Sequence, residues 1–258
     1  MQNRHKVSVV QIENPKYPKN APYHPLTNYI EYPFPSCISS EANYVYDGIR
    51  QLFFKLAFDR EHWNTPEWNP LGHLIKRGMN VVIKPNFVLS QHVENKDIFS
   101  VITHPSILRA IIDYCWIALK GKGKISIADV PSSNCNFEDL LEITKLHKVK
   151  NFLDEFSGPK IEIFDLRNYY FQSKDSYCCT RGLPGDLEGN ISIDLGKESS
   201  FYNHLNLGKF CGAAYDRKKT MDHHSGERHI YEISRTIFNA DIIIFVPKMK
   251  VHKKAGFR

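Results

Sequence analysis

Polar and charged side chains follow three of the apolar runs in this chain. Lys84 and Asn86 end one run, Asp129 ends a second, and Lys248 and Lys250 come directly after a third. The carboxyl ends of parallel strands meet at one edge of a sheet, and α/β proteins bind their ligands there. Because lysine ammonium groups bind phosphate and carboxylate oxygens, we expect a site for a small anion at this edge.

Further residues near the same edge complete the predicted site. Ser132 and Ser133 follow Asp129, and the predicted helix starts beside His104 and Ser133 supply N–H groups that favour an anion. His104, Asp129 and His252 are the candidates for acid–base catalysis, since histidine titrates near neutral pH and a carboxylate can act as a base. Plainer interpretations stay open: solvated strand ends, a histidine at a helix terminus, and a carboxylate that accepts backbone hydrogen bonds.

The sequence contains none of the common cofactor or hydrolase motifs. No G-x-G-x-x-G follows a strand, no C-x-x-C pair could begin a zinc or iron–sulfur site, and neither G-x-S-x-G nor H-E-x-x-H occurs. The six cysteines are scattered and are expected to be reduced thiols. Asp222, His223, His224 and His229 form a histidine-dense stretch, but only a tight turn could aim them at one metal. We therefore predict a solvated loop and no metal site, and the cofactor stays unassigned.

The composition describes a globular protein that handles a small molecule. The chain has 258 residues, a formal net charge of +6 and 42% hydrophobic residues. No apolar run approaches the ~18 residues of a membrane helix, and no signal sequence opens the chain, so we expect a cytoplasmic protein without a membrane partner. Nucleic acid is disfavoured as a partner, because the basic residues form no concentrated stripe with aromatic residues. The expected partner is a small anionic metabolite, and the oligomeric state stays open.

Apolar strands alternate with amphipathic helices along most of the chain. We predict strands at residues 6–12, 80–86, 124–129, 160–165 and 242–246, and helices at about residues 40–58, 105–119, 137–146 and 230–239. This alternation predicts a single α/β domain over residues 1–258, with a Rossmann-like, mostly parallel sheet and helices on both faces. Residues 169–228 break the alternation and are predicted to be a β-containing insertion. The apolarity of Ile242–Val246 predicts an interior strand, covered on both faces.

Several of these segments resemble the bacterial and archaeal domain-of-unknown-function family 362. The resemblance rests on a V-x-K-P-N strand at Val82–Asn86, a T-H-P helix start at Thr103–Pro105 and a strand that ends at Asp129. Its most specific part is A-D-x-I-I-x-V-P-K-x-K-x-H, at Ala240–His252. It covers most of the chain from about Met79 onward. The resemblance implies an α/β core whose activity is unassigned.

The resemblance also implies what lies beyond these residues. In the family the last motif runs on into a K-x-G-x-T-x-x-x-K-N segment, so we expect the natural chain to continue past Arg258. Some members carry a ferredoxin-like pair of iron–sulfur clusters after the domain. Three hypotheses follow: an enzyme of unassigned reaction class acting on an anionic metabolite, an iron–sulfur redox protein whose clusters lie beyond Arg258, and a non-catalytic binding module linked to surface polysaccharide synthesis. The enzyme is the leading hypothesis.

Overall fold

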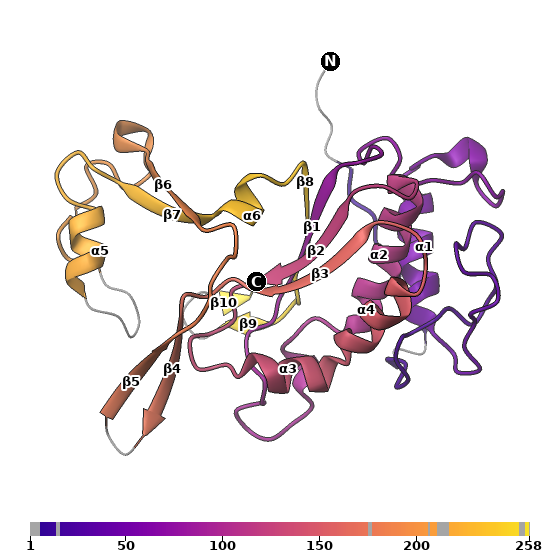
Figure 1. The fold of residues 1–258 in the computed structure, drawn as a ribbon, viewed down its shortest axis with the longest axis horizontal. Coiled ribbons are helices and arrows are strands. Elements are labelled where there is room, and N and C mark those ends of the chain that lie inside the picture. Colours follow the sequence, from indigo (N-terminus) through magenta and orange to yellow (C-terminus); the bar gives the residue numbers. More distant parts are fainter. Residues whose placement is uncertain are drawn as a thin grey trace. The chain divides into compact units, whose positions relative to one another are not determined.

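The computed structural model describes residues 6–13, 16–174, 177–205, 207–210, 217–252 and 256–257. The chain divides into two compact units (Figure 1). Residues 1–185 and 240–258 form the first unit, and residues 186–239 form the second. Within the described ranges, no helix has both the length and the apolarity needed to cross a membrane.

The first unit is built on a sheet of parallel strands. These are β1 (Asn80–Pro85), β2 (Lys124–Asp129), β3 (Lys160–Asp165) and β8 (Ile242–Val246), in the order β3-β2-β1-β8. Most of their residues are β-branched or otherwise apolar, as expected for strands of a parallel sheet. The predicted bounds of β2 and β3 agree with the structure, and β1 ends one residue earlier than predicted. The expected α/β class with a mostly parallel sheet is confirmed.

The place of β8 in the sheet differs from the prediction. Among the described residues its ladder partner is β1 alone, so β8 ends the strand order. Phe245 is 67% exposed, whereas Ile83 on the neighbouring strand is fully buried. A continuous apolar run shows that a strand packs against apolar surface, but it does not report how many strands flank it. The prediction of an interior strand covered on both faces was therefore wrong for this part of the chain.

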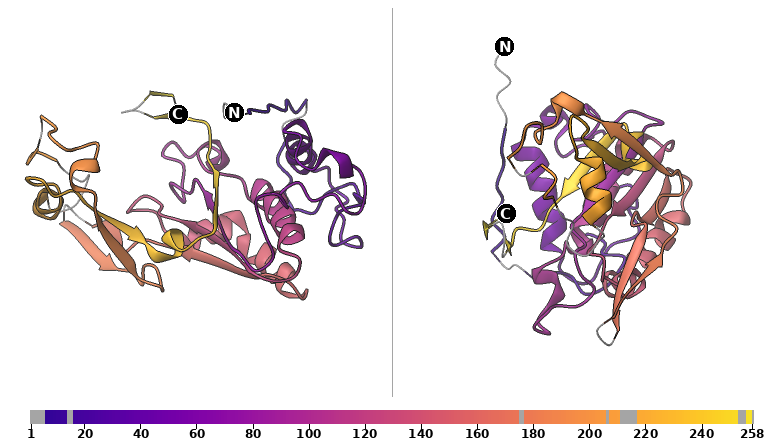
Figure 2. Two further views of the ribbon diagram at one scale, coloured as in Figure 1. Left: turned by 90° about the horizontal axis from the view of Figure 1, so that it is seen from above. Right: turned by 90° about the vertical axis from the view of Figure 1, so that its left-hand side faces the viewer.

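Helices pack beside this sheet and connect its strands. They are α1 (Tyr44–Lys55), α2 (Pro105–Leu119), α3 (Phe137–Thr144) and α4 (Leu146–Asp154), with short 3-10 turns at Arg60–His62 and Ile98–Ser100. α1 and α2 pack against each other, and α2 packs against β1 (Figure 2). α2 is the most deeply buried of them, because most of its residues are apolar and its buried Arg109 and Asp113 pair with each other.

The helix ends follow local capping chemistry. α1 begins later than predicted because Asn43 is its N-cap, and the Asn43 side chain accepts a hydrogen bond from the Tyr46 N–H. The helix predicted at residues 137–146 is two helices, because Lys145 adopts a left-handed φ of 52° that ends α3 and begins α4. α2 begins at Pro105 as predicted, with His104 as its N-cap.

The described N-terminal residues, 6–13 and 16–43, contain neither helix nor strand. Residues 6–12 alternate between exposed and partly buried positions, but they pair with no strand among the described residues. The strand predicted there was therefore wrong. Alternation of exposed and buried residues indicates an extended segment, but a β-strand also needs a neighbouring strand for its backbone hydrogen bonds. The tyrosine-rich segment at residues 16–35 contributes to the hydrophobic core, since Tyr23, Tyr32 and Phe34 are buried.

Antiparallel hairpins account for the remaining strands. In the first unit, β4 (Tyr169–Lys174) pairs with β5 (Tyr177–Gly182), and β9 (Val251–His252) pairs with β10 (Gly256–Phe257). In the second unit, β6 (Asn190–Asp194) pairs with β7 (Ile230–Ser234), beside a 3-10 turn at Gly196–Glu198 and the helices α5 (Arg217–His223) and α6 (Arg235–Phe238).

The helix predicted at residues 230–239 was wrong over its first half. Ile230–Ser234 is the strand β7, and only Arg235–Phe238 is helical. The two halves meet at Ser234, whose hydroxyl accepts a hydrogen bond from the Ile237 N–H and caps α6. Ile230, Tyr231 and Ile233 are residues that favour strands, and their pairing with β6 overrides the apolar spacing that suggested a helix.

A buried ion pair joins α2 to the N-terminal segment. Arg109 and Asp113 are both inaccessible to solvent, with 2.8 Å between Nε and Oδ1. Arg109 also donates to the Pro22 carbonyl (2.9 Å) and to the Tyr32 hydroxyl (3.0 Å), and Asp113 accepts from the Tyr46 hydroxyl (3.1 Å). Because both charges have several partners, the pair specifies how the N-terminal segment lies on α2.

We expect Asp113→Ala to lower the free energy of unfolding by about 3–5 kcal/mol, because it leaves the Arg109 guanidinium buried without a counter-charge. Urea denaturation measures this loss. Asp154→Ala is the matched control, since Lys150 and Asp154 form an exposed pair at the same i,i+4 spacing. That control should cost at most about 0.5 kcal/mol. Equal losses in the two variants would contradict the role of the buried pair.

Candidate functional site

The strand order creates a topological switch point between β1 and β8. The chain leaves β1 toward β2 on one side, while β8 lies on the other side of β1. In open α/β sheets the crevice beyond such a switch point is the usual place for a ligand. Lys84 and Asn86 at the end of β1, and Lys248 and Lys250 after β8, therefore come to one edge of the sheet, together with Asp129 at the end of β2.

Thr103 ties the two strand ends at the switch point together. Its hydroxyl donates to the Val246 carbonyl (2.7 Å) and accepts from the Asn86 N–H (2.9 Å). The Asn86 side-chain amide donates to the Val101 carbonyl (3.1 Å), so this predicted ligand contact holds the loop before α2. Sequence reasoning marked Thr103 only as part of a helix start. A threonine one residue before the N-cap does not reveal that its hydroxyl spans two strands.

Asp129 is the most highly connected side chain of this edge. One carboxylate oxygen lies 2.5 Å from the Lys84 ammonium and accepts from the Val130 N–H (2.9 Å). The other oxygen accepts from the Phe87 N–H (2.6 Å). The carboxylate is almost fully buried, whereas the Lys84 side chain is partly exposed. Asp129 therefore acts as a fixed negative charge that orients Lys84 and shapes the turn after β1, which is the plainer of its two interpretations.

Two lysines after β8 border the same edge. The Lys250 ammonium donates to the Val101 carbonyl (3.0 Å). Partial burial lowers the pKa of Lys250, and the nearby Asp129 carboxylate opposes this effect. Lys248 donates to the Tyr17 hydroxyl (3.1 Å), with its ammonium 5.4 Å from the centre of the Tyr17 ring. Tyr17 was not among the predicted site residues, because nothing in its sequence neighbourhood points to Lys248.

His104 lies in an aromatic environment that keeps it neutral. Its ring stacks on Tyr17 at a centroid distance of 4.1 Å and lies 4.3 Å from the Phe99 ring. Burial and, as the smaller cause, the charge of Lys248 together lower the pKa of His104 to about 3. Nδ1 accepts a hydrogen bond from the Ser106 N–H (3.1 Å), which makes His104 the N-cap of α2.

This geometry limits what His104 can do chemically. The acceptor role of Nδ1 places the proton of the neutral ring on Nε2, so the ring can donate a hydrogen bond but cannot release a proton near neutral pH. His104 also lines a pocket of about 840 Å³ together with Lys16, Lys19 and Lys145. The N-terminus of α2 that was expected to offer free N–H groups is instead capped by His104 itself.

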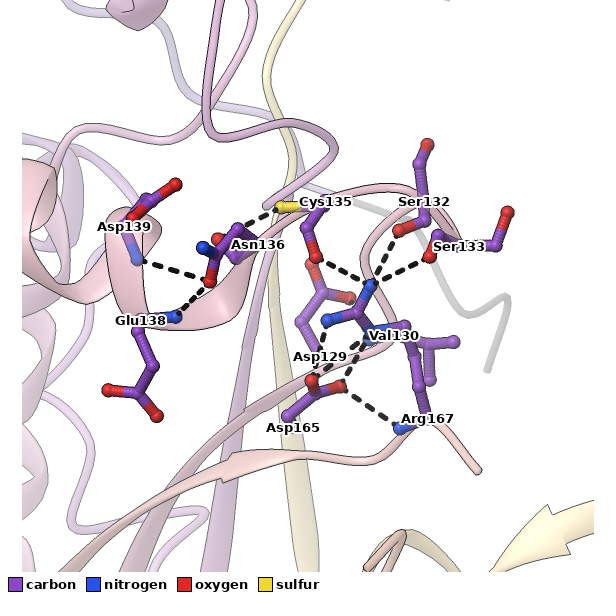
Figure 3. A network of polar contacts seen from close by, with 10 residues as sticks. All are labelled: Asp129, Val130, Ser132, Ser133, Cys135, Asn136, Glu138, Asp139, Asp165 and Arg167. Atoms are coloured by element: carbon purple, nitrogen blue, oxygen red, sulfur yellow. Dashed lines mark hydrogen bonds and ion pairs between the residues drawn. The ribbon is translucent and has the colours of Figure 1, made fainter. Parts of the chain in front are cut away.

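Ser132 and Ser133 contribute their carbonyl groups to a structural network (Figure 3). Arg167 donates from Nη1 to the Ser132 carbonyl (2.7 Å) and the Cys135 carbonyl (2.8 Å). Its Nη2 lies 2.6 Å from an Asp165 oxygen. The hydroxyl groups of both serines point away from Arg167 in Figure 3. Arg167 was missed at the sequence level, because it acts through backbone carbonyls that no motif records.

The start of α3 is unsuited to an anion. The Asn136 side chain accepts hydrogen bonds from the Glu138 and Asp139 N–H groups, so both donors are already bound (Figure 3). Glu138 and Asp139 also place negative charge in the first turn, where it is favourable for the helix but repels an anion. The expectation of free N–H groups at this helix start was therefore wrong.

A separate group of side chains could hold a metal ion. Asp59, Glu61 and His62 offer ligand atoms that all lie within 4.8 Å of one another. The Asp59 carboxylate already accepts from His62 Nδ1 (2.6 Å) and from the Asn69 N–H (2.7 Å), and Glu61 and His62 are exposed. These hydrogen bonds account for the positions of the Asp59 and His62 side chains, so the closeness of the three groups does not require a metal ion.

The backbone of His252 lies in β9, but its side chain falls outside the described part of the chain, as do residues 253–255 and 258.

Comparison with known proteins relates the central segment of the chain to a protein family. Residues 81–179 match the family described as Domain of unknown function (DUF362). The family resemblance seen in the sequence is thereby confirmed over this segment. No curated protein and no solved structure gives a significant match.

The DUF362 segment holds only part of the candidate site. It contains β1 to β3 and α2 to α4, and with them the predicted site residues Lys84, Asn86, His104, Asp129, Ser132 and Ser133. Lys248, Lys250 and His252 lie outside the matched residues. The two lysines join the edge because β8 pairs with β1 in register from Val81 opposite Ile242 to Pro85 opposite Val246.

Thr103→Val should destabilise the protein by about 2 kcal/mol or more, because it leaves the Asn86 N–H and the Val246 carbonyl without their partner. Urea denaturation gives the loss, and amide hydrogen exchange should show faster exchange at Asn86. Thr65→Val is the control, because the Thr65 hydroxyl donates to the His62 carbonyl in an exposed turn. Unchanged exchange at Asn86 would refute the bridging role of Thr103.

Histidine 104 should make stability depend on pH. Its folded pKa of about 3 lies below its ordinary 6.5, so the unfolded chain takes up a proton first. The contribution is complete above about pH 6.5 and is lost as the pH falls toward about 3. His104→Asn, which keeps a capping side chain but does not titrate, should reduce the loss of stability between about pH 7 and about pH 4.5. An NMR titration midpoint of the His104 ring near 6.5 would contradict this assignment.

Proposed function

We propose that the carboxyl edge of β1, β2 and β8 binds a small anionic metabolite through Lys84, Lys248 and Lys250, and that the protein is an enzyme acting on it. The observation that carries this proposal is the gathering of three lysines at the carboxyl edge beside the topological switch point. Lys84 pairs with Asp129, Lys250 is influenced by the same carboxylate, and Lys248 binds the Tyr17 hydroxyl. One carboxylate cannot neutralise three ammonium groups, so the edge keeps an excess of positive charge. A phosphate or carboxylate group would complement that excess.

The lysines differ in the roles that their surroundings support. Asp129 orients Lys84, which makes it a preorganised anion contact. Lys250 is partly buried and its pKa is lowered, so more of it is neutral at a given pH than for an exposed lysine. A lysine of this kind serves as a general base or a nucleophile in enzymes. We therefore add Lys250 to the acid–base candidates, beside His252, while His104 takes the role of a neutral hydrogen-bond donor.

A non-catalytic binding module is the second candidate function. Both oxygens of Asp129 are bound to Lys84 and to backbone N–H groups, and His104 is neutral. These contacts leave less acid–base capacity at the edge than the residue types alone suggest. A binding module of this kind would hold the anion through the same lysines, so turnover of the bound ligand distinguishes the two functions.

Substitution of the edge lysines tests the anion site. Inorganic phosphate, pyrophosphate and a small dicarboxylate serve as probes in isothermal titration calorimetry. Lys84→Ala and Lys250→Ala should each weaken binding of the best probe by about tenfold, which corresponds to ~1.4 kcal/mol. Lys160→Ala is the matched control, because Lys160 is an exposed lysine at the opposite, amino end of β3.

The outcomes separate the alternatives. Retained affinity in both edge variants would refute the anion site. Equal weakening in Lys160→Ala would show that binding follows the overall charge of the chain instead of the edge. Binding should also weaken as ionic strength rises, because the lysines are only partly buried and salt screens them. If the edge variants lose binding but the protein turns over none of a panel of phosphorylated and carboxylated metabolites, the binding module replaces the enzyme.

A further inference from the structure

Two histidines of the second unit face each other across a tight turn. His224 directly follows α5, and His229 directly precedes β7. The turn between them is closed by a hydrogen bond from the Arg228 N–H to the Ser225 carbonyl (3.1 Å), and Gly226 takes a φ of +60°, which suits glycine. As a result the two Nδ1 atoms lie 3.3 Å apart. The sequence-level objection to a metal in this stretch was the need for such a turn.

His229 is held rigidly inside the unit. Its N–H donates to an Asp194 carboxylate oxygen (2.9 Å), and its carbonyl accepts from the Leu195 N–H (3.0 Å). The residue has no exposed surface, and its Nε2 atom has no hydrogen-bond partner among the described residues. If Nδ1 binds a metal ion, the proton of the neutral ring lies on Nε2. The unpartnered Nε2 is therefore not a ligand atom, and the candidate ligand atoms are the two Nδ1 atoms. Since His229 is buried, the solvated loop predicted for this stretch is wrong at this residue.

The separation of the two Nδ1 atoms suits a shared metal ion. Two imidazole nitrogens bound to Zn²⁺ at about 2.0–2.1 Å in a tetrahedral arrangement lie about 3.3 Å apart. The distance in the structure is the same, 3.3 Å. An N–H···N hydrogen bond between two neutral rings is the competing explanation. In that case one ring donates a proton from Nδ1 and the other accepts it, whereas a metal ion would bind the Nδ1 lone pairs of both rings.

Aromatic rings surround His224. The rings of Phe201, Phe210 and Tyr231 lie within 5.8 Å of the His224 ring, measured between centroids. Apolar walls of this kind limit access of water to a bound ion. His223 is oriented differently, since its Nδ1 lies 2.7 Å from the Lys219 carbonyl and its Nε2 lies 4.0 Å from Glu232. His223 therefore provides a control from the same stretch.

We propose that His224 and His229 chelate a divalent transition metal through their Nδ1 atoms, with Zn²⁺ as the expected ion. The two histidines would supply two of the four ligands of a tetrahedral ion, and the bound metal would link the end of α5 to the start of β7. Neutral imidazole ligands select Zn²⁺, Ni²⁺ or Cu²⁺ over Mg²⁺ or Ca²⁺, which prefer oxygen ligands. This proposal departs from the sequence-level prediction of no metal, and it does not depend on the anion site of the first unit.

Metal titration of the whole chain tests the proposal. After treatment with a chelator, the protein is titrated with Zn²⁺ by calorimetry and with Co²⁺ by visible absorption, which reports tetrahedral coordination. We expect tight uptake of Zn²⁺ that His224→Gln weakens by at least about tenfold and His223→Gln leaves unchanged. Circular dichroism confirms that each variant is folded. His224 is preferred to His229 for substitution, because loss of a fully buried ring could unfold the unit.

The results divide cleanly. Absence of Zn²⁺ binding to the wild type, or equal binding by the wild type and folded His224→Gln, would overturn the proposal and leave the hydrogen-bonded pair. A larger loss in His223→Gln than in His224→Gln would place the ion elsewhere and would also overturn it. In the expected case, Zn²⁺ raises the melting temperature of the wild type and of His223→Gln but not of His224→Gln. Mg²⁺ should have no effect on any of the three.

Discussion

The carboxylate of Asp129 is the interaction on which the edge of the sheet depends. It lies at the end of β2, whose residues from Ile125 onward are buried, and it must be neutralised and hydrogen bonded, since an unpaired buried charge is very costly. Lys84 provides the charge, and the Phe87 and Val130 N–H groups provide the hydrogen bonds. The same contacts set the course of the chain after β1 and β2. The excess positive charge at this edge therefore comes from Lys248 and Lys250, which approach it from β8.

Side chains of the protein itself connect the strand ends at the switch point between β1 and β8. Thr103 bonds both strand ends, and His104 caps α2 while lying under Tyr17. Tyr17 in turn accepts a hydrogen bond from Lys248. The N-terminal segment is thus coupled to the candidate site at one end and to the Arg109 ion pair in the core at the other. Any ligand at this edge would meet a surface whose aromatic and basic groups already hold one another in place.

The second unit is organised by a different principle. Its described residues form one two-stranded ladder, β6 with β7, and the short helices α5 and α6, so few backbone contacts define it. Polar side chains supply much of its order: the buried Asp186 binds Ser234 and Thr236, and the exposed Asp194 accepts from the His229 and Gly196 N–H groups. A metal ion that links α5 to β7 would contribute a large share of the stability of so small a unit, because small hydrophobic cores contribute little stability.

The sequence by itself determined the parallel sheet, the bounds of β2 and β3, the start of α2 and the family of the central segment, because local periodicity and short motifs carry that information. It also brought Lys84, Asp129 and Lys248 to one edge, since parallel topology requires it. Only the tertiary structure decided that both oxygens of Asp129 are already hydrogen bonded and that burial keeps His104 neutral. It also decided that β8 ends the strand order and that His224 faces His229. Each of these depends on burial or on contacts distant in sequence or across a turn, and local pattern does not encode them.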